Sequence, residues 1–119
     1  MTATLVERYL AAWNETDADA RAKAVALLWT EDGTYTDPMA DVAGHEAIAA
    51  VIAGAQQMFP GLVFTAGEVD DAHHDVARFT WHLAPEGAAE PLAVGFDVVR
   101  LAEDGRIRQV IGFLDKVPA

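Results

Sequence analysis

The stretch LAVGFDVVRLAEDGRIRQVIGFLDK, residues 92–116, decides the fold of this chain. It holds two apolar runs, at about Leu92–Leu101 and Arg106–Lys116, and the Asp104-Gly105 pair between them is a strong signal for a β-hairpin. Both alternation classes of the first run are apolar, which is typical of a strand that is buried on both faces. We therefore expect helices against one face of this hairpin and a second layer or a partner against the other.

The strand-like period extends back from this hairpin to Gly61. It predicts two further strands, at about Leu62–Val69 and Asp75–Leu83. Asp70-Asp71 and Pro85-Glu86-Gly87 have turn composition, and we expect them to separate the strands. Four consecutive strands joined by short turns indicate an antiparallel sheet.

The residues before Gly61 have a helical period instead. The apolar spacing predicts three helices, at about Thr4–Trp13, Ala18–Trp29 and His45–Phe59. Between the last two, Thr34–Thr36 favours a short strand that stops before Pro38, and a loop follows to Gly44. Helices first and hairpin-linked strands last is the α+β pattern, with the helices packed on one face of a curved sheet in a single domain, residues 1–119.

The charge balance excludes some partners. The chain has 119 residues, with 19 Asp and Glu against 8 Lys and Arg, which gives a net charge of −11. This charge argues against binding to nucleic acid and against docking on an anionic membrane. The apolar start of the chain is interrupted by Glu7 and Arg8, unlike a signal peptide, and no apolar run is long enough to span a bilayer. We therefore expect a cytoplasmic protein.

Asp97 is a polar residue in an apolar place. It lies in the same alternation class as Ala93, Gly95, Val99 and Leu101, so it is expected on a buried face. A buried carboxylate is costly unless it is paired, and otherwise it takes up a proton. The plainer interpretation is that Asp97 faces a wetter patch or pairs with Arg78 or Arg100.

Two other polar residues are ambiguous in the same way. Tyr9 lies between Leu5 and Trp13 on the apolar stripe of the first helix, where an ordinary core aromatic also fits. Asp37 precedes Pro38, a pair that commonly starts a turn. Either residue is consistent with a structural role or with a functional one.

The sequence gives no sign of a metal site or of a phosphate-binding loop. The densest group of potential metal ligands is Asp70-Asp71 with His73-His74, and it falls at an expected turn. The chain has no cysteine, no Gly-rich phosphate loop and no HExxH motif. We therefore expect neither a metal nor an organic cofactor.

The order of elements resembles the nuclear-transport-factor-2-like superfamily, which includes ketosteroid isomerases and SnoaL-type polyketide cyclases. The resemblance covers about Thr4 to Lys116. Its local markers are Glu7–Leu10, Trp29–Pro38, Gly44–Ile48, Phe96–Arg100 and Asp104–Ile107. It implies a SnoaL-like domain in which three helices and a mixed, mainly antiparallel sheet form a cone around an apolar pocket.

Within the superfamily, the chain is similar to the ketosteroid isomerases at three positions. Tyr9 follows Arg8, as the catalytic tyrosine of those enzymes follows an arginine, and Asp37 precedes a proline, as their general base does. Asp97 stands on the strand before the Asp-Gly hairpin, where they keep a protonated aspartic acid. The resemblance implies a cofactor-free ketone isomerase with Asp37 as base and with Tyr9 and Asp97 as proton donors.

The pocket departs from the steroid enzymes. Trp29 and Ile52 stand where those enzymes have further tyrosines, and Leu114 stands in place of a tryptophan. We expect the following residues to line a pocket for a small apolar or polycyclic ligand: Trp13, Trp29, Ile52, Phe59, Val99 and Phe113. Asp97 is expected deep in this pocket with a raised pKa, and Asp37 at its wet rim.

Two other functions fit the same resemblance. One is a polyketide cyclase of the SnoaL type, which also uses an acid–base carboxylate in a dry pocket. The other is a non-catalytic module that binds a small ligand or a protein, because fold alone does not give function. Members of this fold often pair through the convex face of the sheet, so we expect a homodimer.

Overall fold

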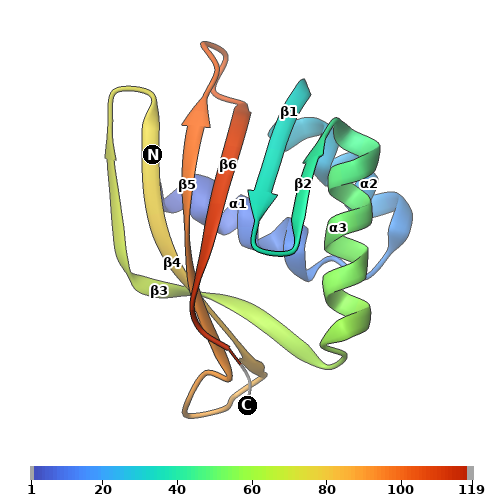
Figure 1. The fold of residues 1–119 in the computed structure, drawn as a ribbon, viewed down its shortest axis with the longest axis vertical. Helices are drawn as coiled ribbons and strands as arrows, with labels where there is room; N and C mark the ends of the chain where they lie inside the picture. Colours follow the sequence, from blue (N-terminus) through green and yellow to red (C-terminus); the bar gives the residue numbers. More distant parts are fainter. Residues whose placement is uncertain (1, 118–119) are drawn as a thin grey trace.

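The computed structural model describes residues 2–117, which form three helices and six strands (Figure 1). In chain order the elements are α1 (Thr2–Asn14), α2 (Ala18–Leu28), β1 (Trp29–Asp37), β2 (Ala40–Ala43), α3 (His45–Met58), β3 (Leu62–His73), β4 (Val76–Pro85), β5 (Ala93–Leu101) and β6 (Ile107–Lys116). None of these helices is long and apolar enough to cross a membrane. The predicted α+β class is confirmed.

The strands form one mixed sheet in the order β2-β1-β6-β5-β4-β3. Only the pairing of β1 with β6 is parallel within the described residues, and it places Tyr35 opposite Val110. The sheet does not close on itself, and α1 crosses behind it while α3 lies beside β2 (Figure 1). Strands that are far apart in sequence, β1 and β5, therefore lie on either side of β6.

The apolar stripe of α1 forms the centre of the core. Tyr9 is 1% exposed, and its ring packs against Phe79 at 5.2 Å and Trp29 at 5.6 Å between centroids. Ile48 and Ile52 of α3 are fully buried in the same cluster. Because the stripe recurs at helical spacing, α1 can lie along the inner face of the sheet with its charged residues in water.

Strand β5 is buried on one face only within this chain, whereas its apolar sequence predicts burial on both faces. Ala93, Gly95, Asp97 and Val99 are buried toward the helices, whereas Val94, Phe96 and Val98 on the other face are only half-buried. The inner face of β5 therefore carries one carboxyl group among apolar residues.

The structure corrects three boundaries. The short strand expected at Thr34–Thr36 is the longer β1, which already begins at Trp29, where the second helix was expected to end. Part of the expected loop before Gly44 is strand β2, whose backbone pairs with β1 in a hairpin between Asp37 and Ala40. Asp70 and Asp71 do not form a turn. They lie inside β3, which is an edge strand, where charged side chains can reach water and discourage pairing with other chains.

The last turn of α1 is fastened on two sides. The Asn14 side chain accepts from the Phe64 backbone N–H and donates to the Phe64 carbonyl, each at 2.8 Å, so it ties the helix to β3. From α3, the Gln56 side chain donates to the carbonyl oxygens of Trp13 at 2.9 Å and Glu15 at 2.7 Å. These bonds satisfy carbonyl groups that a helix end leaves without partners.

Candidate active site

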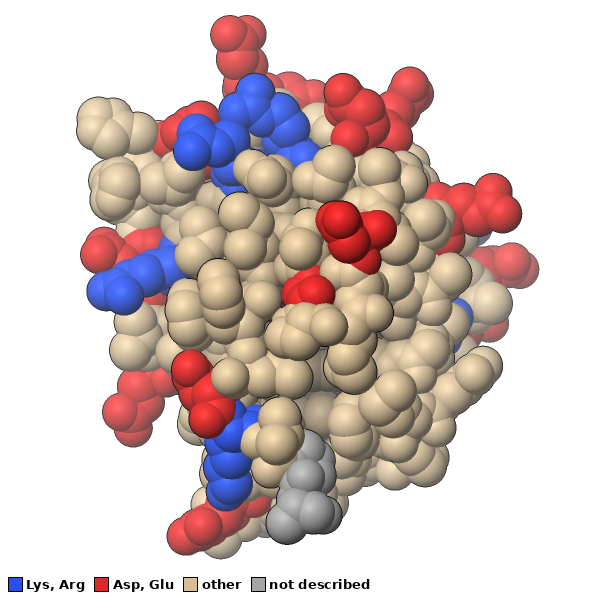
Figure 2. Space-filling model, viewed as in Figure 1, with Lys and Arg blue, Asp and Glu red and all other residues tan. Residues whose placement is uncertain are grey.

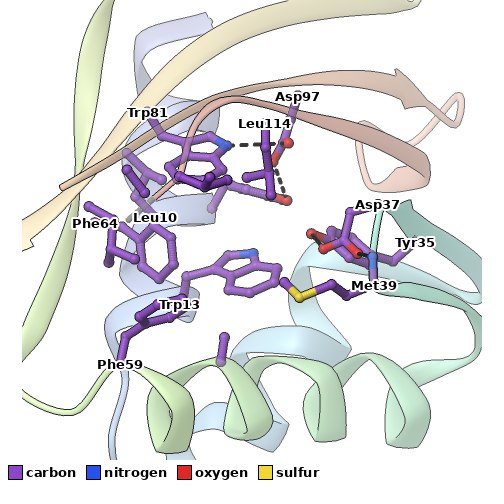
Figure 3. Close-up of a pocket in the computed structure, with 15 residues that line it drawn as sticks. Leu10, Trp13, Tyr35, Asp37, Met39, Phe59, Phe64, Trp81, Asp97 and Leu114 are labelled. Atoms are coloured by element: carbon purple, nitrogen blue, oxygen red, sulfur yellow. Dashed lines mark hydrogen bonds between the residues drawn. The ribbon is translucent and has the colours of Figure 1, made fainter. Parts of the chain in front are cut away.

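A cavity of about 230 Å³ lies between the inner face of the sheet and helices α1 and α3 (Figure 3). Most of its wall is apolar. The lining residues are Tyr9, Leu10, Trp13, Tyr35, Asp37, Met39, Ala55, Phe59, Phe64, Trp81, Leu83, Ala93, Asp97, Leu114 and Val117. An apolar cavity with a few convergent polar groups is the usual form of a small-molecule site.

Asp97 is the buried polar group of this cavity. Its side chain accepts a hydrogen bond from the Tyr9 hydroxyl at 2.7 Å and one from the Trp81 indole N–H at 3.3 Å. Gly95 leaves the space that the Trp81 ring occupies, since a Cβ there would overlap it. The arginine alternative does not hold, since Arg100 pairs with Asp75 at 2.9 Å and Arg78 is exposed on the other face of β4.

The surroundings of Asp97 change its acidity. Burial raises the pKa of Asp97 from 3.8 to about 6, the hydrogen bonds from Tyr9 and Trp81 oppose this rise, and the Asp37 charge adds to it. Burial, together with the Asp97 charge, also raises the pKa of Tyr9 well above its ordinary value. Tyr9 therefore remains a proton donor at every physiological pH.

Asp37 combines turn chemistry with a place in the cavity wall. Its Oδ1 accepts from the backbone N–H groups of Met39 and Ala40, both at 2.8 Å, and thereby closes the β1–β2 turn. Its Oδ2 accepts from the Tyr35 hydroxyl at 2.7 Å. Burial, followed by the Asp97 charge, raises the pKa of Tyr35 far above its ordinary value, so this hydroxyl also keeps its proton.

A glycine separates the two carboxyl groups. Gly112 of β6 pairs with Asp97 on β5 and lies beside Asp37 on β1, so the three residues form a row across neighbouring strands. A Cβ at Gly112 would lie 2.6 Å from Asp97 Oδ1 and 3.6 Å from the Asp37 Cβ. The small residue in the middle gives both side chains room on the same face.

The structure brings the three candidate catalytic residues together. Tyr9, Asp37 and Asp97 all line the cavity, although they come from α1, β1 and β5. Trp13 and Phe59, expected as pocket residues, line it as well.

The other four expected pocket residues lie elsewhere. Trp29, Ile52 and Val99 are fully buried in the core, where neighbouring side chains cover them, and they do not line the cavity. Phe113 is 49% exposed, and its ring stacks on Phe96 of the outer sheet face at 5.1 Å between centroids. Phe113 faces outward because its neighbours Gly112 and Leu114 on β6 face the site.

Two polar residues of the site were missed in the sequence. The sequence places Tyr35 in a short strand, two residues before Asp37 and therefore on the same face. Trp81 alternates with Phe79 and Leu83 on β4, which places all three toward the helices. The strand period could have identified both residues, but their hydrogen-bond partners depend on how the strands pair.

The site is organised around organic acid–base groups. Within residues 2–117, no group of three or more His, Asp or Glu side chains is placed to hold a metal ion. A phenol, an indole N–H and a protonated carboxyl group can donate hydrogen bonds to a ligand oxygen, and a carboxylate can accept a proton from a ligand carbon.

Comparisons with known proteins agree with this architecture. The model of the SnoaL-like domain family matches residues 6–110. A solved structure from Agrobacterium tumefaciens, of a SnoaL-like protein provisionally assigned as an isomerase, is 41% identical, with a TM-score of 0.90 over 96% of this chain and 97% of that one. No curated protein sequence matches the chain.

More distant structures show the same fold. A provisionally assigned polyketide cyclase from Sinorhizobium meliloti is 19% identical, with a TM-score of 0.70 over 92% of this chain and 93% of that one. A SnoaL-like protein from Burkholderia thailandensis is also 19% identical, with a TM-score of 0.73 over 95% of this chain and 93% of that one. The family match spans most of the chain, and the expected superfamily is confirmed: this chain belongs to the SnoaL-like family.

Proposed function

We propose that this chain is a cofactor-free isomerase that moves a carbon–carbon double bond into conjugation with a ketone. The observation that carries the proposal is that buried Asp97, bonded to Tyr9, shares one apolar cavity with the carboxyl group of Asp37. The isomerase assignment of the Agrobacterium tumefaciens protein, at 41% identity, supports the same class of reaction.

In this reaction Asp37 acts as the base. Its carboxylate takes a proton from the carbon between the carbonyl group and the double bond, and the C–H electrons delocalise to the carbonyl oxygen as a dienolate. Asp37 then returns the proton to the far carbon of the former double bond, which leaves a conjugated ketone and a regenerated carboxylate. The reaction needs no net oxidant or reductant.

Tyr9 and Asp97 stabilise the dienolate. Donors that face the oxygen strengthen their bonds as its charge develops, and this effect lowers the barrier. With a pKa of about 6, Asp97 exchanges its proton near neutral pH. An apolar ligand that fills the cavity removes water from Asp97 and favours the protonated form, from which Asp97 and Tyr9 together can donate.

Turnover of β,γ-unsaturated ketones with one to four rings tests the proposal, because the conjugated product absorbs in the ultraviolet. Replacing Asp37 with Asn keeps an oxygen for the Met39 and Ala40 N–H groups but removes the base. We expect Asp37→Asn to lower kcat by about 10²–10⁴-fold. Asp41→Asn is the matched control, since Asp41 bonds Thr36 outside the cavity wall and its loss should leave turnover intact.

The alternatives predict different results. A wild-type protein that turns over no cyclic enone, yet binds an apolar phenol tightly, is a ligand-binding module. Ring closure of a linear polyketone without enone isomerisation indicates the cyclase. Equal turnover by Asp37→Asn and the wild type would show that Asp37 is not the base.

A further inference from the structure

One cavity residue has a polar atom with no partner. The Trp13 side chain is 6% exposed, and its indole Nε1 makes no hydrogen bond within the described residues. A buried N–H that leaves water and finds no acceptor costs free energy. The Trp29 Nε1 is also without a partner, but Trp29 does not line the cavity.

The orientation of Trp13 directs this N–H toward the acid end of the cavity. Figure 3 shows the nitrogen edge of the indole turned toward the side that holds Asp97. The Trp13 and Tyr9 rings are neighbours, with their centroids 6.2 Å apart. The Trp13 N–H forms no hydrogen bond with Tyr9, whose hydroxyl donates to Asp97.

We infer that the Trp13 N–H is a ligand-binding donor, which holds an oxygen atom of the bound molecule at the acid end of the cavity, while the Tyr9 proton stays in its hydrogen bond to Asp97. This inference rests on the proposed function for the location of the ligand, but it does not require turnover. A ligand oxygen bound there gives the Trp13 N–H the acceptor that it lacks. Trp13 is then a specificity-determining residue, and not only a part of the apolar wall.

The charges of the cavity limit the kind of ligand oxygen that the Trp13 N–H can bind. Asp37 and Asp97 line the cavity, and none of the described lining residues is Lys, Arg or His. A ligand carboxylate or phosphate meets two acidic groups without a compensating cation, which is unfavourable in an apolar site. The bound oxygen therefore belongs to an uncharged acceptor, such as a ketone or lactone carbonyl, on an otherwise apolar molecule.

Matched ligands distinguish a hydrogen bond from the Trp13 N–H from apolar contact with the cavity wall. 2-Tetralone carries a carbonyl oxygen, tetralin has the same rings without it, and tetralin-2-carboxylate carries a charge. The measurements use the Asp37→Asn variant, in which binding is read without chemistry. We expect 2-tetralone to bind about tenfold more tightly than tetralin, equivalent to about 1.4 kcal/mol, and the carboxylate to bind more weakly than the ketone.

Replacing the nitrogen of the Trp13 side chain with sulfur removes only its hydrogen-bond donor. Replacing the Trp13 indole with benzothiophene keeps the shape of the ring and its packing, so the fold is retained. We expect this change to abolish the preference for ketone over hydrocarbon while tetralin binds as before. If the benzothiophene protein keeps the full preference for ketone over hydrocarbon, the inference is overturned. It is also overturned if the protein with Trp13 binds 2-tetralone no more tightly than tetralin, or binds neither.

The indole N–H signals in ¹⁵N NMR give a direct readout. With 2-tetralone bound, the Trp13 signal should move downfield, and the Trp29 signal, outside the cavity wall, should stay in place. A bound ketone with an unmoved Trp13 signal overturns the inference even where the enzyme turns over enones. A shifted Trp13 signal in a protein without isomerase activity supports it and rejects the proposed function.

Discussion

The hydroxyl oxygen of Tyr9 lies 2.7 Å from Oδ2 of Asp97, and this bond joins helix α1 to strand β5 across 88 positions of the sequence. Both residues are nearly excluded from water, at 1% and 3% exposure. A hydrogen bond in such a place is electrostatically stronger than at the surface, and its loss leaves the other partner buried without compensation. The pair therefore has measurable effects on stability as well as on chemistry.

Asp97 is expected to make the protein less stable as pH rises. The pKa of Asp97 is about 6 in the folded chain against 3.8 ordinarily, so between these pH values the folded state binds more protons than the unfolded one. Stability falls over this interval, by about 3 kcal/mol in total. The Asp97→Asn variant lacks this loss, so its stability relative to the wild type should rise between pH 4 and pH 8.

Urea denaturation at pH 4 and at pH 8 measures this difference. The exposed Asp71→Asn on β3 is the control, because Asp71 has no buried environment to lose. An Asp97→Asn variant whose stability relative to the wild type is the same at both pH values contradicts the prediction.

Removing the Tyr9 hydroxyl should raise the pKa of Asp97 above about 6. The hydrogen bond from Tyr9 favours the charged carboxylate and so lowers the pKa of Asp97. Without it, in Tyr9→Phe, the effect of burial raises this pKa further. The Asp97 carboxyl carbon signal in ¹³C NMR, followed against pH, measures the change. Tyr35→Phe is the matched control because Tyr35 bonds Asp37 and not Asp97, and a pKa that stays near 6 in Tyr9→Phe argues against the bond.

Adding a methyl group at Gly112 should disturb both carboxyl groups. In Gly112→Ala the new Cβ would lie 2.6 Å from Asp97 Oδ1, so Asp97 must move away from its bonded position. Overpacking of this kind costs about 1–3 kcal/mol, and we expect turnover to fall with it. Gly54→Ala on α3 has open space and should add about 0.4–1 kcal/mol of stability. Equal unfolding free energies for the two variants contradict the argument.

The outer sheet face is expected to pair with a second copy of the chain. Phe96 and Phe113 stack there with an angle of 17° between their ring planes. Figure 2 shows a broad uncharged area over β5 and β6. We propose a homodimer through this face, because an exposed apolar patch of this kind is typical of an interface. Size-exclusion chromatography at micromolar concentration should give a dimer, and Phe113→Glu should give a monomer. A monomeric wild type would rule the proposal out.

Local signals in the sequence predict most of the fold. The stripe around Tyr9 and the Asp104-Gly105 hairpin depend on neighbours in the chain, and both elements are present. The four residues of β2 have no strong period of their own, and they become a strand only because β1 lies beside them. Asp70 resembles a turn residue, yet an edge strand accepts it because one side of that strand meets water.

The candidate site is harder to predict than the fold. Asp97 was identifiable because a carboxyl group interrupts an apolar alternation. The bond from Trp81 to Asp97 depends on the pairing of β4 with β5, which sets Trp81 opposite Gly95 and leaves its ring free to lean across. Whether Trp13 or Trp29 faces the cavity depends on how the helices pack against the sheet. This packing depends on residues that are far apart in the sequence, so no short stretch predicts it.

The bonds from Asn14 and Gln56 have a consequence for how a ligand reaches the cavity. They hold the turn of α1 that carries Trp13 before any ligand arrives, so little of the binding free energy is spent on ordering this wall. We expect the ligand to enter at Met39 and Val117, because they line the cavity but are 65% and 58% exposed. Entry and exit should therefore depend on the side chains of Met39 and Val117, while the inner part of the cavity keeps its shape and selects ligands by it.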